Sequence, residues 1–232
     1  MQRREFSSGS IIALALGLLP AAARAQPLAS LSSGEATQGL KAALEQGAIS
    51  AVNLLGKPGG FLENPKVRIP LPGYLEDAAG LLRMTGLGGR LDELVTAMNR
   101  AAEQAVPMAK DMLVDAAKSM SVTDAKNVLT GGETSVTDYF AKKTRAPLFK
   151  EFLPVAARAT ENVGAASLYN QVAGKAAGFN LVKAEDAKIE GYVANKALDG
   201  LFLMIGEEEK KLRANPLGAS SDLLRKVFGS LK

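Results

Sequence analysis

Residues 196–213 read KALDGLFLMIGEEEKKLR, and this stretch decides the fold class. Apolar residues recur at helical spacing along it, and the turn from Leu201 to Ile205 is apolar all round. A helix that is apolar on every side is typical of a segment buried among other helices. The stretch therefore predicts a long helix over about 184–213. We expect its central packing turn to be formed by Leu201, Phe202, Met204 and Ile205.

Helical periodicity continues on both sides of this stretch. No run of four or more alternating β-branched or aromatic residues predicts a strand. Further helices are expected over about 33–55, 91–116, a short segment after Ser121, 168–177 and 220–228. The stretch 91–116 is either one helix kinked at Pro107 or two nearly collinear helices, and at least two pieces are expected within 135–163 because of Pro147 and Pro154. The predicted fold is all-α, a multi-helix bundle in a single domain over residues 26–232.

The composition removes most common catalytic sites. The chain has 232 residues, of which 47% are hydrophobic, and it contains no histidine, cysteine or tryptophan. It therefore cannot form a Ser-His-Asp triad, a Cys-His pair, a disulfide or a histidine-ligated metal site. We expect no cofactor and no metal, and only carboxylates remain as general acids or bases.

The first 25 residues have the layout of a cleavable signal peptide. Two arginines precede an apolar stretch over 11–19, and the small-x-small end Ala23-Arg24-Ala25 predicts cleavage before Gln26. The Arg-Arg-Glu-Phe start also resembles a twin-arginine signal, so the general secretory and twin-arginine routes both stay open. The expected location is the periplasm, with no membrane-spanning helix.

The irregular stretch GKPGGFLENPKVRIPLPG, residues 56–73, has four prolines and four glycines in 18 residues. We expect an ordered loop packed across the bundle. The simpler interpretation is that Phe61, Ile69 and Leu71 fix it to the helices while its charges are solvated. Prolines also hold the backbone extended, so the loop is a candidate binding segment. Its candidate binding residues are Asn64, Lys66 and Arg68.

Four further charged residues are candidates for the same site. Arg100 and Glu103 are three residues apart on a helix, which favours a surface ion pair, with a buried polar network against the loop as the alternative. Glu207 and Glu208 are expected to pair forward with Lys210, Lys211 and Arg213. The alternative is oxygen coordination of Mg²⁺ or Ca²⁺, with Glu103 brought opposite as in a two-carboxylate hydrolase.

Two more segments carry polar side chains at helical spacing. Thr134, Ser135, Thr137 and Asp138 stand at an expected helix start, where capping is the simpler role and anion binding the alternative. The second segment is basic, and a solvated helix face explains it more simply than contact with anionic lipid or a polyanion. It contains Lys142, Lys143, Arg145, Lys150 and Arg158.

Four segments together resemble the bacterial domain of unknown function family 4197, from about Gly34 to the C-terminus. They are VNLLGKPGGFLENPKVRIPLPG, LDELVTAMNRAAEQAVPMAKDML, DAKNVLTGGETSVTDYF and KALDGLFLMIGEEEKKLRANPLG. The resemblance implies an exported helical protein of Gram-negative bacteria whose activity is not established. It supplies no catalytic residues.

Two functional hypotheses follow from these features. The preferred one is a non-enzymatic binding or scaffold protein of the envelope that uses loop 57–73 to hold an envelope protein or a small anionic ligand. The alternative is a carboxylate- or divalent-metal-dependent hydrolase. Without residues 1–25 the chain has 25 basic and 23 acidic side chains. This near neutrality, together with export, argues against nucleic acid as a partner.

Overall fold

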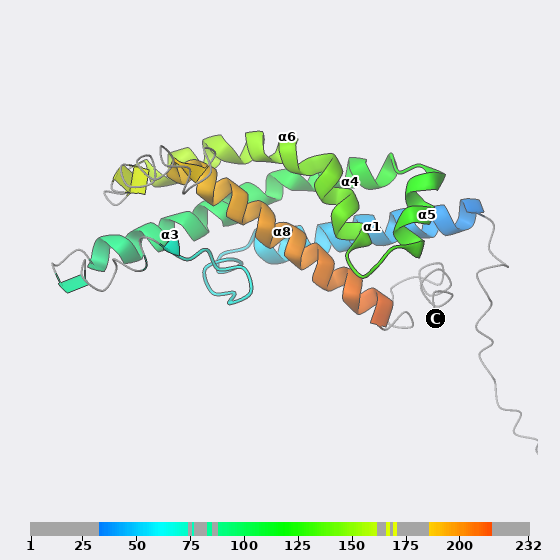
Figure 1. Ribbon diagram of the computed structural model, residues 1–232, viewed down its shortest axis with the longest axis horizontal. Coiled ribbons are helices and arrows are strands. Elements are labelled where there is room, and N and C mark those ends of the chain that lie inside the picture. Colours follow the sequence, from blue (N-terminus) through cyan, green and yellow to red (C-terminus); the bar gives the residue numbers. More distant parts are fainter. Residues whose placement is uncertain are drawn as a thin grey trace, which may run out of the picture.

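The computed structural model describes residues 33–73, 76, 83–84, 88–161, 166–167, 169–170 and 186–214. Every regular element among them is a helix, so the predicted all-α class is confirmed. In chain order they are α1 (Ser33–Leu55), α3 (Gly88–Ala105), the 3₁₀ helix η2 (Val106–Met108), α4 (Ala109–Lys118), α5 (Val122–Thr130), α6 (Ser135–Thr160) and α8 (Ile189–Ala214) (Figure 1). The expected helix over 220–228 lies outside the described residues, as does most of the one over 168–177.

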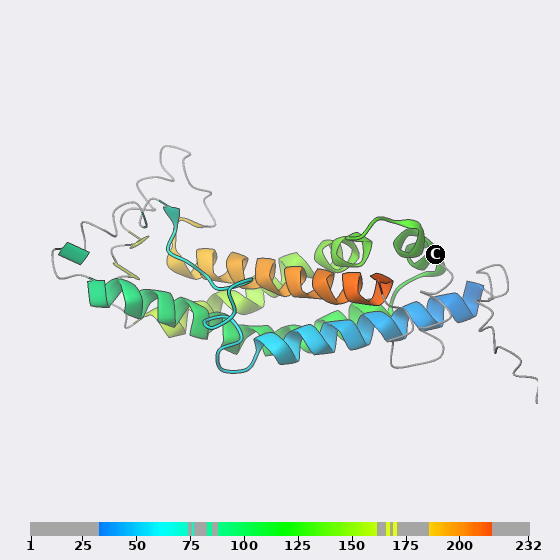
Figure 2. The same cartoon turned by 90° about the horizontal axis from the view of Figure 1, so that it is seen from below.

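The helices form an elongated bundle around α8. Figure 1 shows α8 running diagonally across the bundle, with α6 along its upper border, and Figure 2 shows the same helices from below. It packs against all three of these helices, and α1 packs against α4. Buried apolar side chains from every described helix and from the loop after α1 join in one core cluster. The boundaries of a single domain over residues 26–232 stay a prediction.

The expected kink at Pro107 is present as the 3₁₀ turn η2 between α3 and α4. Proline has no amide to donate and clashes with the preceding turn, which disfavours a regular α-helical turn at this position. The predicted start of α5 is also confirmed. The Ser121 hydroxyl accepts from the Asp124 amide, and the Asp124 carboxylate accepts from the Ser121 amide in return.

The expectation of at least two pieces within 135–163 is wrong, because α6 is continuous from Ser135 to Thr160 with Pro147 and Pro154 inside it. Both prolines are exposed and stand two helical turns apart on the outer side. The carbonyls that lose an amide partner lie on this same side, so they are not trapped in the core. The helix bends toward the bundle instead of ending, as Figure 1 shows.

The start of the last long helix also differs from the expectation, since α8 begins at Ile189 rather than near residue 184. The amide of Ile189 donates to the Asn170 side-chain oxygen at 2.8 Å. The helix therefore begins where a distant asparagine supplies the acceptor that its first amide needs.

The central packing turn is confirmed. Leu201, Phe202, Met204 and Ile205 are all buried. Leu203, however, is 45% exposed, so the turn is not covered on every side as its composition suggests. Gly200 precedes the turn, and a Cβ there would lie 2.7 Å from the Phe61 ring. The loop therefore packs directly on α8 where the helix has no side chain.

None of the helices in the described part of the chain combines the length and apolarity needed to cross a bilayer.

The packing turn offers a matched test of burial. Leu201→Ala removes a side chain that is 0% exposed, whereas Leu203→Ala makes the same chemical change at a half-exposed position. We expect the first to lower the free energy of unfolding by about 2–5 kcal/mol. The second should lower it by about 1 kcal/mol or less. Urea unfolding followed by circular dichroism measures both, and equal losses would contradict the assigned packing.

Candidate functional site

The loop over 56–73 turns alternate side chains toward and away from the bundle. Val67, Ile69 and Leu71 are buried, while Arg68 and Pro70 between them are exposed. This is the alternation expected of an extended segment with one packed side. The loop is therefore ordered and packed across the helices, as its sequence predicts.

A buried carboxylate fixes the first half of the loop. The Oε1 atom of Glu103 accepts the amides of Phe61 and Leu62, each at 3.1 Å. Its Oε2 atom accepts from the Arg100 guanidinium at 2.6 Å. Glu103 is only 4% exposed, so the simpler interpretation of a surface ion pair is wrong, and the alternative of a buried network with the loop is correct. The loop amides are the reason, because buried donors need an acceptor.

The environment of Glu103 favours its charged form. Burial acts to raise its pKa, but the amide of Leu62, the guanidinium of Arg100 and the amide of Phe61 together hold the pKa below its ordinary value of 4.5. Glu103 is thus an ionised group that holds the backbone in place, and all its hydrogen-bonding partners are internal.

Asn99 fixes the second half of the loop in the same way. Its Oδ1 atom accepts the Ile69 amide at 2.8 Å, and its Nδ2 atom donates to the Ile69 carbonyl at 2.9 Å and to the Val95 carbonyl at 2.7 Å. Asn99 is fully buried, and it was not among the residues that the sequence singled out. The signal was available, because an asparagine four residues after Val95 lies on the apolar stripe of its helix.

Asn64 has a local role. Its side-chain oxygen accepts the Lys66 amide at 3.1 Å, and its carbonyl accepts the amides of Val67 and Arg68. Such bonds are typical of an asparagine that shapes a turn. Asn64 therefore sets the path of the loop, which is a different role from that of a ligand-binding residue.

Lys66 ties the loop to α8 through an ion pair with Glu207. The Lys66 ammonium holds the pKa of Glu207 below its ordinary value. Lys210 also approaches Glu207, at 3.8 Å, and Glu208 pairs with Lys211 at 2.7 Å. The expected forward pairing along the helix is thus present for Lys210 and Lys211, whereas Arg213 pairs with Glu209.

Arg68 differs from Lys66. Its side chain is exposed, and no carboxylate of the described residues lies within ion-pair distance of it. Beside the loop is an open hollow of about 310 Å³. It is lined by Gly56, Pro58, Arg100, Glu103, Gln104 and Pro107.

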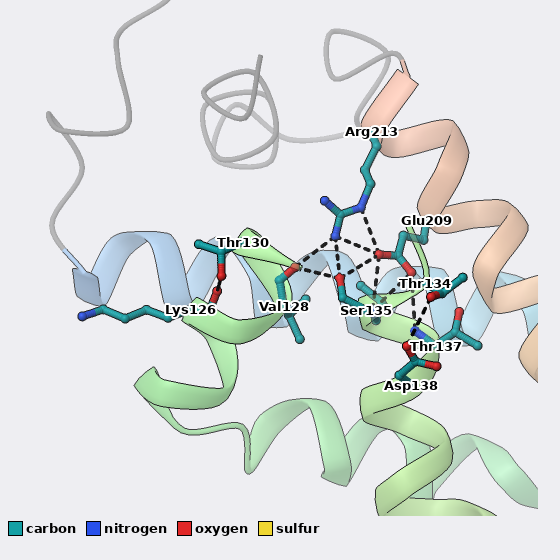
Figure 3. Close-up of polar contacts among 10 residues, drawn as sticks. Lys126, Val128, Thr130, Thr134, Ser135, Thr137, Asp138, Glu209 and Arg213 are labelled. Carbon is teal, nitrogen blue, oxygen red and sulfur yellow. Dashed lines mark hydrogen bonds and ion pairs between the residues drawn. The ribbon is translucent and has the colours of Figure 1, made fainter. Parts of the chain in front are cut away.

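A second polar cluster stands at the start of α6, where Glu209 of α8 accepts the amides of Val136 and Thr137 at 3.2 and 3.4 Å (Figure 3). Arg213 donates to the Glu209 carboxylate at 2.9 Å and to the Ser135 hydroxyl and Val128 carbonyl at 2.8 and 3.0 Å. Glu209 is 3% exposed. The predicted capping by the side chains of this helix start is therefore wrong, since Thr134 at the N-cap makes no side-chain capping bond and Glu209, from a helix distant in sequence, accepts the amides instead.

The hydroxyls near this start act locally. Thr134 donates to Asp138 at 3.2 Å, and Ser135 donates to the Val128 carbonyl at 2.8 Å. The Thr137 hydroxyl is buried and has no hydrogen-bond partner among the described residues. Burial raises the pKa of Glu209, and Arg213 with the amides of Val136 and Thr137 offsets part of that rise. The α6 amides that were candidates for an external anion are thus occupied by an internal one.

A search with protein-family descriptions matches residues 30–229 to the family described as Protein of unknown function (DUF4197). The match covers most of the chain. The chain belongs to the DUF4197 family. Neither the comparison with curated proteins nor the comparison with solved structures finds a match.

In this DUF4197 protein the predicted carboxylates do not act together. Glu103 binds the loop and Arg100, Glu207 binds Lys66, and Glu208 binds Lys211. Within the described ranges, no three acidic side chains are grouped so that they could hold a metal ion. The geometry thus gives the hydrolase hypothesis no support, and it gathers Asn64, Lys66, Arg100 and Glu103 around the loop.

The lowered pKa of Glu103 in this DUF4197 protein predicts a pH-dependent stability. Glu103→Gln should lower the free energy of unfolding by about 2–4 kcal/mol near neutral pH, since a buried ionised acceptor is lost. The folded-state pKa lies below the unfolded value, so the carboxylate stabilises fully above about 4.5 and stops stabilising as the pH falls through the folded-state pKa. Glutamine does not titrate. The difference in the free energy of unfolding between wild type and variant should therefore decrease as the pH falls.

Urea unfolding at several pH values measures this difference in the free energy of unfolding. Glu93→Gln is the matched control, because Glu93 is an exposed acid on the same helix. That variant should stay within about 0.5 kcal/mol of the wild type. If the loss of unfolding free energy caused by Glu103→Gln stays constant as the pH falls, the carboxylate charge is unimportant for holding the loop.

Proposed function

We propose that this protein is an exported, non-enzymatic binding protein of the cell envelope. The outward edge of loop 57–73 is its recognition surface, and the partner is an envelope protein or a small anionic ligand. The single observation that carries the proposal is the fixation of the loop. Its inner edge is held by buried apolar side chains and by Asn99 and Glu103, while its outer edge keeps Arg68 exposed.

Fixation matters because binding by a mobile segment has to order that segment first. Here the helices already hold the loop backbone, and prolines 58, 65, 70 and 72 limit its dihedral angles. The side chains on the outer edge are therefore presented without a large ordering cost. A connection between two helices does not need this construction, since most connections are shorter than this 18-residue stretch.

The hollow beside the loop supports the same proposal. It is walled by Pro58 and Pro107, and the half-exposed side chain of Arg100 lies at its edge with that of Gln104. Proline walls provide apolar contact, and a guanidinium and an amide provide directed hydrogen-bond donors. A partner lying on the loop therefore finds a place for one side chain or one acidic group beside Pro58 and Arg100.

The loop proposal predicts that Arg68 matters for binding and little for folding. Arg68→Ala should leave the unfolding midpoint unchanged within the equivalent of about 0.5 kcal/mol, because the side chain is exposed. A photoreactive amino acid placed at exposed position 57 of the loop should form a discrete adduct in living cells. We expect Arg68→Ala to abolish that adduct.

Position 126 provides the control for this experiment. Lys126 is an exposed cation on α5, outside the loop. Lys126→Ala should keep the adduct formed from position 57, and the photoreactive group at position 126 should not form that adduct. An adduct that survives Arg68→Ala, or the lack of any adduct from the loop, would refute the binding role and leave the loop with a structural role alone.

The proposed export rests on the order of charge, apolar stretch and small residues in 1–25. We expect the protein of the periplasmic fraction to begin at Gln26, as determined by N-terminal sequencing. Replacing Arg3 and Arg4 by lysine separates the two routes, since the twin-arginine route should then fail and the general secretory route should not. A chain recovered intact from Met1 in the cytosol would contradict the proposal.

A further inference from the structure

Charge is distributed unevenly among the described helices. The helix α6 has five cationic and two anionic side chains, a net charge of +3. Each of the other described α-helices has a net charge of zero or −1, including α8 with its three consecutive glutamates. Among the described helices, α6 is therefore the one with a net positive charge.

Most of that charge lies on the outer side of α6. Lys143, Pro147, Lys150, Pro154 and Arg158 recur at intervals of four, three, four and four residues, which places them along one face. All five are exposed. Beside this row the buried residues Leu148, Phe152, Val155 and Ala156 lie on the opposite side of α6, whereas Val136, Tyr139 and Phe140 precede the row. Both α3 and α8 pack against α6. Figure 1 shows this helix along the border of the bundle.

The cations of this face make no ion pair with a carboxylate of the described residues, although Lys143 lines a hollow together with Asp124 and Asp138. Arg145, which lies off the face, pairs with Asp199 of α8. For Lys143, Lys150 and Arg158, no carboxylate of the described residues lies within ion-pair distance. Lys143 is instead 5.9 Å from the centre of the Tyr139 ring. Lys150 and Arg158 therefore have no ion-pair partner among the described residues to lose when they approach an anionic surface.

We propose that the outer face of α6 docks on the surface of an anionic phospholipid bilayer. This inference goes beyond the loop, since it assigns a second surface of the protein to a different occupant. The complementary charge is the row of Lys143, Lys150 and Arg158, with the exposed Lys142 beside it. Each basic residue near an anionic membrane increases binding about fivefold, so the row is sufficient for reversible, salt-sensitive association.

The shape of the outer face of α6 favours a bilayer over a polyanionic chain as its partner. Pro147, Pro154 and Ala146 separate the cations along the helix, and all three are exposed. These side chains are short, so the cations stand above them along a convex helix. A flat sheet of phosphate groups can meet all the cations of such a face together. Recognition of nucleic acid uses contacts within a groove as well as phosphate contacts, and this face offers only the latter.

The test is flotation of the purified protein with vesicles. Vesicles that contain phosphatidylglycerol are compared with vesicles of phosphatidylcholine alone, at low salt and at about 0.5 M salt, where the Debye length falls to a few ångströms. The double variant Lys143→Gln, Lys150→Gln removes two charges from the face. The matched control is Lys110→Gln, Lys126→Gln, which removes two exposed charges from α4 and α5. Circular dichroism confirms that each variant is folded.

We expect the wild type to bind the anionic vesicles only, and salt to release it. The α6 variant should bind roughly 25-fold more weakly, because two cations are lost, and the control should bind like the wild type. The apolar stretch over 11–19, where present, would add binding that depends on neither lipid charge nor salt. The difference between the two lipids is therefore the readout.

Several results would overturn the proposal. One is the absence of wild-type binding to the anionic vesicles, and another is an equal loss in both double variants, which would indicate a response to net charge alone. Tighter binding to a short DNA duplex than to the vesicles, lost in the α6 variant, would assign the face to a polyanion instead. Because Arg68 is unchanged in every variant, the loop experiment is unaffected by any of these results.

Discussion

The structure depends on finding acceptors for backbone amides that are buried outside regular secondary structure. An unpaired buried amide costs as much as a lost hydrogen bond or more, so a loop can cross a helical core only if side chains provide its partners. Glu103 and Asn99 provide them for the loop after α1, through the amides of Phe61, Leu62 and Ile69. Both residues come from α3, four residues apart on one side of the helix. One face of α3 thus provides the hydrogen-bond acceptors that a neighbouring strand would provide in a β-sheet.

The same solution recurs at the start of α6, where the carboxylate of Glu209 accepts the first free amides of the helix. The two buried glutamates differ in how well they are compensated. The partners of Glu103 outweigh its burial, so its pKa is lowered, whereas burial outweighs the partners of Glu209, so its pKa is raised. Arg213 reaches Val128 and Ser135 as well as Glu209, so it shares its donors. Because the two pKa shifts have opposite signs, acidification reduces the stability contributed by the Glu103 charge and relieves the cost of burying the Glu209 charge.

The sequence predicts the features that local rules determine. Helix periodicity gives the extent of α1, the 3₁₀ break at Pro107 follows from the missing amide, and the capping box at Ser121 follows from its spacing to Asp124. The continuity of α6 could not be predicted in this way. Pro107, Pro147 and Pro154 are all exposed, so whether a proline breaks a helix or bends it depends on the packing around it and not on the residue or its exposure alone.

The roles of the charged residues were harder to predict for a related reason. Sequence spacing shows which charges are neighbours on one helix, and it correctly pairs Glu208 with Lys211. It does not show which carboxylate meets a backbone from another element, so Glu103 resembled a surface residue and Glu209 resembled its two neighbours. Asn99 was not predicted, because the spacing of charged residues gives no signal for a neutral side chain that supplies both a donor and an acceptor. Long-range polar contacts need the fold before they can be assigned.

The shortage of reactive side chains also shapes how charge is used. Without histidine or cysteine, carboxylates are the most versatile polar groups in the chain, and the structure uses Glu103, Glu207 and Glu209 to hold elements together. These acids come from α3 and α8, the two helices that pack most extensively against α6. Acidic side chains are thereby drawn toward internal contacts, and the cations of α6 that point away from those helices keep their charge exposed. The charge asymmetry of the surface is thus a consequence of how the interior is held together.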